Sequence, residues 1–395
     1  MWTILFLSAL SAGPTVELTP LGGQAVTGEL VELNGKQATI QTGKGPLAQP
    51  LEQIATLSVK DREARPASTR GVWIDLADGC FVVAEDFAIS QGRAAISLAG
   101  GKTLEVPARD VQSVRFQPQD EASGREWSRI LGLNTDSDLL IVRKDDALDY
   151  HAGVIREVSE AVVQFELDKD LLPVKRAKIY GLRFHQAAGR ELPAPLCRLA
   201  QTNGSRWAVR SISLEGGKLR WETLLGLALE ADPSSLAQID FSQGKIVYLS
   251  DLVPESTTWT PYFAARKELP SMAEFFAPRR NRALQPGPLQ LGGKSYEKGL
   301  ALRSRTEMVY RLPDGFRRLL ATVGIDDRVR PRGNVRLVIR GDERVLLDIA
   351  VTGDDPPKPI DLELGGAGRL TILVDYGEDM DLADHLDLCE ARMVK

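Results

Sequence analysis

The sequence contains few of the residues from which metal sites and covalent-catalysis sites are usually built. Its 395 residues include only three cysteines and three histidines. Cys80, Cys197 and Cys389 lie far apart, so they form neither a CxxC pair nor a disulfide framework. No G-x-S-x-G, H-E-x-x-H or P-loop motif occurs either. These absences argue against zinc proteins, nucleophile-elbow hydrolases and P-loop nucleotide enzymes.

Excess positive charge and long apolar runs are also missing. The formal net charge is −5, and because nucleic-acid binding needs a basic face, we expect no nucleic-acid partner. No stretch approaches the ~20 apolar residues of a membrane span, so no transmembrane segment is predicted.

The first residues, MWTILFLSALSAG, join a short apolar run to small residues, which is typical of a secretory signal. No Lys or Arg precedes the run, so an N-terminal strand or a misplaced start codon remains an alternative. We expect a signal peptide at residues 1–13 and a protein that is secreted, or located in the periplasm or cell envelope.

Alternating apolar residues bounded by Gly, Asn, Asp and Pro predict strands through most of the chain. One apolar pattern recurs, with apolar residues at its positions one, four and six. Its four copies are IATLSV (54–59), VQSVRF (111–116), IYGLRF (179–184) and LAQIDF (236–241). Hairpin-like segments precede the copies at residues 29–42, 88–106, 153–167 and 211–224.

This repetition predicts an all-β protein that begins with small antiparallel units resembling SH3 or Sm-like barrels. Two units are expected in residues 14–121 and two more in residues 137–250. ASGREWSRILGL, at residues 122–133, is the best helix candidate, so a helical connector is predicted at residues 122–136.

A different composition follows. Residues 247–263 begin as a strand and then turn polar, and residues 277–293 are rich in Pro, Gly and Arg without periodicity. A linker or wrapping arm is therefore predicted at residues 251–293. Beyond them, short segments such as VRLVIR and IDLELG alternate apolar and polar residues. Such a series of half-buried strands predicts a β-sandwich or jelly roll.

The same region carries a family resemblance. PLQLGGKSYEKGLALRSRTEMVYRL, then ATVGIDDRVRPRGNVRLVIRGDERVL, then LTILVDYGEDMDLADHLDLCEARMV contain K-G-L, V-G-x-D-D, R-G-N-V and D-H elements in that order. Residues 257–395 resemble the NPCBM family of carbohydrate-binding modules, which is associated with glycoside hydrolases of family 98. The segment VYLSDLVP is similar to the one that precedes this module in large secreted proteins of the planctomycete type. The resemblance implies a galactose-binding-like β-sandwich that attaches to carbohydrate.

The sequence departs from the family pattern at several positions. Arg303 and Ser304 stand where the family usually has His-Ser, and Phe276 and Leu388 replace two tryptophans. Asn281 replaces an aspartate. Aromatic faces hold the C–H surfaces of sugars, so these departures bear on the glycan site and leave the apolar alternation of the strands unchanged.

Asp326 and Asp327 lie between an apolar strand and the turn RPRGN. They can cap the loop by accepting backbone N–H bonds, which is the favoured interpretation. Two alternatives stay open. The aspartates can hold a structural calcium ion with further oxygens from Asp384 and Glu390, because calcium binds carboxylate oxygens, or Asp327 can contact a sugar directly.

Arg303, Tyr296, Asp327 and His385 are the candidate carbohydrate-binding residues. His385 could instead pair with a neighbouring aspartate and fix the last strand, and Arg303 could simply be surface charge. Exposed side chains of Tyr296, Phe276 and Trp259 would favour sugar binding, whereas burial of these aromatics would favour a scaffold.

No pair of carboxylates is set apart by its context as the two carboxylates of a glycoside hydrolase are, so we expect no enzymatic activity. The sequence predicts an exported, non-catalytic carbohydrate-binding protein whose partner is a glycan or glycoconjugate. The alternative is an envelope scaffold that binds other envelope proteins through its repeats and a degenerate sandwich.

Overall fold

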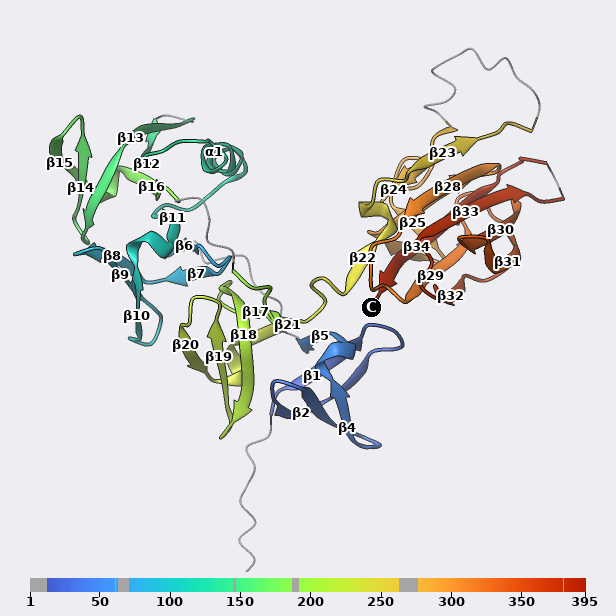
Figure 1. Cartoon of the computed structure of the whole chain (residues 1–395), viewed down its shortest axis with the longest axis horizontal. Coiled ribbons are helices and arrows are strands. Elements are labelled where there is room, and N and C mark those ends of the chain that lie inside the picture. The colour runs from blue at the N-terminus through green and yellow to red at the C-terminus, as the bar shows by residue number, and fades with distance from the viewer. Residues whose placement is uncertain are drawn as a thin grey trace, which may run out of the picture. The chain divides into compact units, whose positions relative to one another are not determined.

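The computed structural model describes residues 13–60, 62, 71–144, 147–186, 192–262, 276–378 and 380–395. The chain divides into two compact units, Met1–Ser242 and Gln243–Lys395. Antiparallel strands dominate both units (Figure 1), which confirms the all-β prediction. Among the described residues, no helix is long and apolar enough to cross a membrane. Residues 1–12 of the predicted signal peptide lie outside the described residues.

Hydrogen-bonded pairs connect the 21 strands of the first unit into one antiparallel system. These strands fall into four sets, here called repeats one to four, and each repeat ends in a short 3-10 helix followed by a final strand. Repeat one contains β1 (Thr15–Pro20), β2 (Val26–Leu33), β3 (Gln37–Thr42), β4 (Gly45–Pro50), η1 (Leu51–Gln53) and β5 (Ile54–Val59). Repeat two contains β6 (Val72–Leu76), β7 (Phe81–Ala84), β8 (Asp86–Ser90), β9 (Arg93–Ser97), β10 (Thr103–Pro107), η2 (Ala108–Asp110) and β11 (Val111–Arg115).

The second pair of repeats follows the same order. Repeat three contains β12 (Asp138–Lys144), β13 (Ala147–Val158), β14 (Val162–Leu167), β15 (Asp170–Lys175), η3 (Arg176–Lys178) and β16 (Ile179–Arg183). Repeat four contains β17 (Cys197–Gln201), β18 (Arg206–Glu215), β19 (Lys218–Thr223), β20 (Ala228–Ala231), η4 (Pro233–Ser235) and β21 (Leu236–Asp240).

The four final strands carry the recurring apolar pattern, and they join the repeats in pairs. Strand β5 pairs with β21, with Leu57 opposite Ile239. Strand β11 pairs with β16, with Val114 opposite Leu182. In both pairs the two position-four residues face each other, so each pair has local two-fold symmetry. Repeat one is thereby joined to repeat four, and repeat two to repeat three.

The α-helix α1 (Glu121–Leu131) lies between repeats two and three and confirms the predicted helix. The Asp120 side chain accepts a bond from the Ser123 backbone N–H, and the Ser123 hydroxyl accepts one from the Asp120 N–H. This capping box satisfies backbone donors at the start of the helix. Trp127 is buried and meets the Tyr180 ring edge-on, with centroids 5.7 Å apart. The helix therefore packs on the β16 end of the third repeat.

The second unit is a sandwich of two sheets with a common core. The first sheet contains β24 (Arg279–Arg280), β27 (Gly299–Arg303), β34 (His385–Val394), β29 (Arg318–Ile325) and β32 (Lys358–Glu363), in that order, with β22 (Ile246–Tyr248) beside β34. The second contains β23 (Ser256–Trp259), β28 (Thr306–Arg311), β33 (Arg369–Tyr376), β30 (Asn334–Gly341) and β31 (Arg344–Thr352). Leu302 and Leu386 of the first sheet share one hydrophobic cluster with Tyr310 and Leu337 of the second. The β-sandwich prediction is confirmed by this shared core.

A separate hairpin, β25 (Leu289–Leu291) and β26 (Lys294–Tyr296), covers the outer face of β34. Its Leu289 and Leu291 pack with Cys389 on that face, while Leu386 and Leu388 point into the sandwich core. Both faces of β34 are therefore covered, and every residue from His385 to Cys389 is buried.

The segment 251–293, predicted as a linker, differs from that expectation. It begins within η5 (Leu249–Asp251) and supplies β23, β24 and β25, which pair with β28, β27 and β26. Residues 263–275 of this segment lie outside the described residues. Strands of two to four residues are too short to show a two-residue period, which is why the sequence resembled a linker there.

Gly181 provides a test of how α1 is held. A Cβ atom at Gly181 would lie 2.6 Å from both the Trp127 ring and the Val114 carbonyl oxygen. We expect Gly181→Ala to lower the free energy of unfolding by about 1–3 kcal/mol, because the ring and the strand cannot both move away. Urea unfolding of the full chain measures the change. Gly43→Ala is the control, since no atom lies within 4 Å of a Cβ there; equal stability of the two variants would contradict this packing.

Candidate functional site

Asp326 follows β29 directly and is almost completely buried. Its carboxylate accepts hydrogen bonds from the backbone N–H and the guanidinium of Arg328, the latter at 2.9 Å. Its own backbone N–H donates to the His385 carbonyl at 2.9 Å. Asp326 therefore ties the loop after β29 to the beginning of β34.

Asp327 caps a different turn. Its two carboxylate oxygens accept the backbone N–H groups of Gly292 and Gly293, at 2.9 and 2.7 Å, in the turn between β25 and β26. Its own N–H donates to the Gln290 carbonyl. These bonds, together with those of Asp326, confirm the loop-capping interpretation of the two aspartates.

The structure does not gather the four predicted calcium ligands. Asp384 is buried and accepts bonds from the Ser304 hydroxyl and the Asn334 N–H. Glu390 lies six residues further along β34, roughly 20 Å away at the usual rise of a strand, and accepts bonds from Tyr248 and Arg392. Within the described part of the chain, no group of three or more His, Cys, Asp or Glu residues lies close enough to hold a metal ion.

A buried carboxyl group that the sequence analysis did not select is Asp387. It has no solvent exposure, and its Oδ2 accepts the Gln290 N–H at 3.3 Å. Burial, with the adjacent Asp326 as the second cause, raises the pKa of Asp387 to about 8. Asp387 is therefore largely protonated at neutral pH. The sequence gives one signal that this acid is buried. Asp387 stands between Leu386 and Leu388, in the apolar last strand of the chain.

Four side chains form the cluster that has the chemistry of a ligand site; they are Trp259, Phe276, Arg303 and His385, here called the Phe276 cluster. The rings of Trp259 and Phe276 are stacked in parallel, with centroids 4.3 Å apart. The Arg303 guanidinium lies 5.2 Å from the Phe276 ring centroid. Trp259 donates its indole N–H to the Ser304 carbonyl at 3.2 Å, which fixes the stack against the end of β27. Trp259, Phe276 and Arg303 are half-buried.

His385 completes the cluster because it lies opposite Arg303 in the pairing of β27 with β34. Burial, followed by the charge of Arg303, lowers the pKa of His385 to about 4, so the imidazole is neutral at pH 7. Its Nδ1 is buried and has no hydrogen-bond partner among the described residues. A buried polar atom without a partner costs about 1–3 kcal/mol, and such atoms often mark functional positions.

The four predicted sugar-binding residues separate into two pairs. Arg303 and His385 meet in the Phe276 cluster, whereas Tyr296 lies on the β25–β26 hairpin and Asp327 caps the turn of that hairpin. Tyr296 is half-buried beside Leu289 and Leu291, and the Lys294 ammonium lies 4.8 Å from its ring. Full exposure of Tyr296, Phe276 and Trp259 was expected for a sugar-binding protein, and full burial for a scaffold. All three are half-buried, so their exposure does not decide between the two functions.

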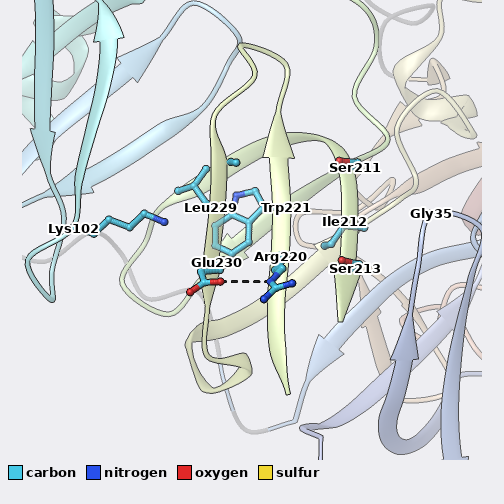
Figure 2. A pocket seen from close by; sticks show the side chains of 10 residues that line it. Gly35, Lys102, Ser211, Ile212, Ser213, Arg220, Trp221, Leu229 and Glu230 are labelled. Atoms are coloured by element: carbon cyan, nitrogen blue, oxygen red, sulfur yellow. Dashed lines mark ion pairs between the residues drawn. The ribbon is translucent and has the colours of Figure 1, made fainter. Parts of the chain in front are cut away.

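The N-terminal unit contains a cavity of about 420 Å³. Ile212, Trp221 and Leu229 of repeat four line it, with Lys102 of repeat two and Gly35 of repeat one also contributing. Figure 2 shows Arg220 and Glu230 joined by an ion pair at the edge of the cavity, at 3.5 Å. Trp221 is 4% exposed, so it offers no open ring face to a ligand.

Comparison with protein families gives one match. Residues 245–394 match the NPCBM/NEW2 domain, which confirms the resemblance of the C-terminal part. No curated protein is similar enough to this chain to count as a match.

Several solved structures are similar. The CBM51 module of Clostridium perfringens GH95, in complex with methyl-galactose, is 21% identical; the match covers 38% of this chain and 99% of that one, with a TM-score of 0.32. The CBM51-2 and INT domains of Clostridium perfringens ZmpB, in complex with GlcNAc, are 20% identical over 45% of this chain and 36% of that one, with a TM-score of 0.33. The tandem CBM51 modules of a Streptococcus pneumoniae family 98 glycoside hydrolase are 14% identical over 67% and 89%, with a TM-score of 0.31.

The hairpin cap gives one prediction. Asp327→Ala removes the acceptor of two backbone N–H groups, so we expect the free energy of unfolding to fall by about 1–2 kcal/mol. Hydrogen exchange at Gly292 and Gly293 should quicken in the full chain. The control is Asp314→Ala, an exposed aspartate whose side chain has no hydrogen bond to the described residues. Unchanged exchange at both glycines would contradict the capping role.

The buried carboxyl gives a second prediction, which concerns pH. Asp387 holds a proton in the folded chain up to about pH 8, but in the unfolded chain only up to about pH 4. Its contribution to stability is therefore lost as the pH rises from about 4 to 8. The contribution of His385 has the opposite sign: it raises the stability of the fold as the pH rises from about 4 to 6.5. The reason is that the imidazole binds its proton more tightly in the unfolded chain. Above pH 6.5 the contribution of His385 no longer changes with pH, so it does not mask the effect of Asp387.

We therefore expect Asp387→Asn to gain about 1–2 kcal/mol relative to the natural sequence between pH 6.5 and 8. Urea unfolding of both chains at pH 6, 7 and 8 measures this difference. A constant difference across the three pH values would show that Asp387 does not carry its proton in the folded state.

Proposed function

We propose that this protein is an exported, non-catalytic carbohydrate-binding protein that holds a glycan on the loops of its C-terminal sandwich, at the Phe276 cluster. Two findings support the proposal. Residues 245–394 match the NPCBM/NEW2 domain, a family of carbohydrate-binding modules. The observation that carries the proposal is the Trp259–Phe276 stack, with Arg303 on one side and a neutral imidazole beside it.

The cluster contains the groups that sugar recognition requires. Aromatic rings pack against the C–H faces of sugars, and a few placed polar groups bind the hydroxyls. Trp259 and Phe276 are half-buried, so part of the stack remains accessible. The Arg303 guanidinium can donate to hydroxyl oxygens, and His385 lies opposite Arg303 and supports its position.

A non-catalytic role is part of the proposal. Asp326 and Asp387 resemble a hydrolase pair in one respect, since the pKa of Asp387 is raised while Asp326 forms an ion pair with Arg328. Both carboxyls are almost completely buried, and Asp387 is bonded to the covering hairpin through Gln290. A glycosidic bond would have to reach both carboxyls. The proposed location in the envelope or outside the cell rests on the N-terminal apolar run alone.

A second candidate function is protein binding by the repeats, and one observation favours it. Counting back from the 3-10 helix of each repeat, Leu172 of β15 occupies the position of Leu104 in β10 and Leu229 in β20. Leu104 and Leu229 are 5% and 6% exposed, whereas Leu172 is 42% and its neighbour Leu171 is 57% exposed. Apolar residues exposed on an edge strand favour contact with another protein. The SH3-like or Sm-like nature of the repeats stays a prediction.

Glycan binding can be tested with the full chain. We expect a glycan array to identify at least one saccharide ligand, and calorimetry to give about a tenfold or greater loss of affinity for Arg303→Ala and for Phe276→Ala. Arg317→Ala is the matched control, because Arg317 is exposed and precedes β29, whereas the cluster lies near the other end of that strand. A folded chain that binds no glycan would overturn the proposal and favour the protein-binding alternative.

A further inference from the structure

The loop between β29 and β30 carries three arginines at alternate positions. Arg328, Arg330 and Arg332 line a cavity of about 460 Å³, together with Val329, Pro331 and Ala383. This volume lies within the usual range of small-molecule sites, which is about 300–1,000 Å³. Within the described part of the chain, the arginines are the only polar side chains that line the cavity, so its chemistry is that of guanidinium groups.

The loop is held in place by its own backbone. The Val329 N–H donates to the Asp326 carbonyl, and the Arg332 N–H donates to the Val329 carbonyl, both at 3.1 Å. Gly353, which follows β31, packs closely against the loop: a Cβ atom there would lie 2.2 Å from the Pro331 carbonyl oxygen. The arginines therefore project from a fixed turn, and fixed donors lose less entropy when they bind a ligand.

The charges around the cavity do not balance. Arg328 forms a close ion pair with Asp326, at 2.9 Å, whereas Arg330 forms a longer one with Asp327, at 3.9 Å. Among the described residues, no carboxylate lies within ion-pair distance of Arg332, whose residue is exposed. The nearby acid Asp355 is bound to Lys358 instead. An excess positive charge therefore remains at Arg332.

The cavity adjoins the Phe276 cluster. Ala383 lines the cavity, and His385, two residues later, belongs to the cluster. Two residues span at most ~7 Å, so the backbone that borders the cavity continues directly into the cluster. Burial, followed by the charge of Arg279, lowers the pKa of the Arg303 guanidinium, and the charge of Asp381 acts in the opposite direction.

We propose that the cavity lined by Arg328, Arg330 and Arg332 binds the anionic group of an acidic saccharide, while the sugar ring packs at the Phe276 cluster. The anionic group is either the carboxylate of a uronic acid or a sulfate ester. The proposal rests on the proposed glycan-binding function and names the class of glycan. Guanidinium groups suit this role because their planar N–H pairs bind carboxylate and sulfate oxygens in a bidentate manner. A neutral sugar offers no partner for the excess charge at Arg332.

The experiment compares three oligosaccharides of equal length on the full chain: a galactose oligomer, a galacturonate oligomer and a sulfated galactose oligomer. Calorimetry at 0.15 M salt measures each affinity. We expect at least one acidic oligomer to bind about tenfold or more tightly than the neutral one. Arg332→Ala should remove this preference and leave the neutral affinity within about twofold. The two acidic oligomers distinguish carboxylate from sulfate.

Two matched variants test whether the effect is local. Arg330→Ala removes a second guanidinium from the cavity and should reduce the preference in the same way. Arg317→Ala removes the same charge near the opposite end of β29 and should leave the preference intact. Arg328 is not varied, because its ion pair with Asp326 holds the loop.

Three results would overturn the proposal. If all three oligomers bind equally, glycan binding stands and the acidic class is wrong. If Arg317→Ala lowers the preference as much as Arg332→Ala, the preference reflects overall charge and the cavity is not the site. If a folded chain binds none of the oligomers and no glycan on an array, the proposed function and this inference both fail.

Discussion

The ion pair between Asp326 and Arg328 is the contact on which one end of the C-terminal sandwich depends, namely the end that carries the Phe276 cluster and the loop between β29 and β30. Asp326 is buried at the end of β29, where an unpaired carboxylate would be very costly. Arg328 supplies the counter-charge and donates a further bond to the Pro288 carbonyl at 2.7 Å. Asp326 also donates its backbone N–H to His385. Asp326 and Arg328 together therefore fix the loop between β29 and β30, the approach to the β25–β26 hairpin and the start of β34.

This arrangement also explains how two carboxyls can share one buried space. The Asp326 carboxylate has the Arg328 guanidinium as its ion-pair partner, at 2.9 Å. Asp387 has no such partner and remains neutral by holding a proton. Its neighbours on β34 face either the sandwich core or the hairpin, and Asp387 itself has no solvent exposure. Stability, positioning of the hairpin and the charge of the loop are thus set by the same group of side chains.

Much of the fold could be predicted from the sequence, because it depends on local patterns. The four copies of the apolar pattern became the final strands β5, β11, β16 and β21, and the periodic segment near residue 122 became α1. The strands of the sandwich also followed their alternating residues. The pairing of repeats could not be predicted, since nothing local to Leu57 indicates that its partner is Ile239.

The site was predicted only in part. Arg303 and His385 were selected and lie together, but the sequence placed Asp326, Asp327, Asp384 and Glu390 in one group that the structure separates. Neighbours in sequence diverged because successive side chains on a strand or turn point in different directions. Arg328, Arg330 and Arg332 were missed, although their alternation in DDRVRPRGN was visible. Their significance depends on a cavity, and a cavity exists only after folding.

The nested pairing of the repeats has a consequence for synthesis. The outer pair joins strands separated by 180 residues, as the contact between Ser58 and Gln238 shows, and the inner pair closes within that interval. At ~5–20 residues per second, a ribosome needs roughly 10–40 s to make the intervening chain. The edge of β5 therefore waits, unpaired, until repeat four emerges. An open strand edge can join other chains, so during translation the first repeat exposes an edge that the fourth repeat later covers.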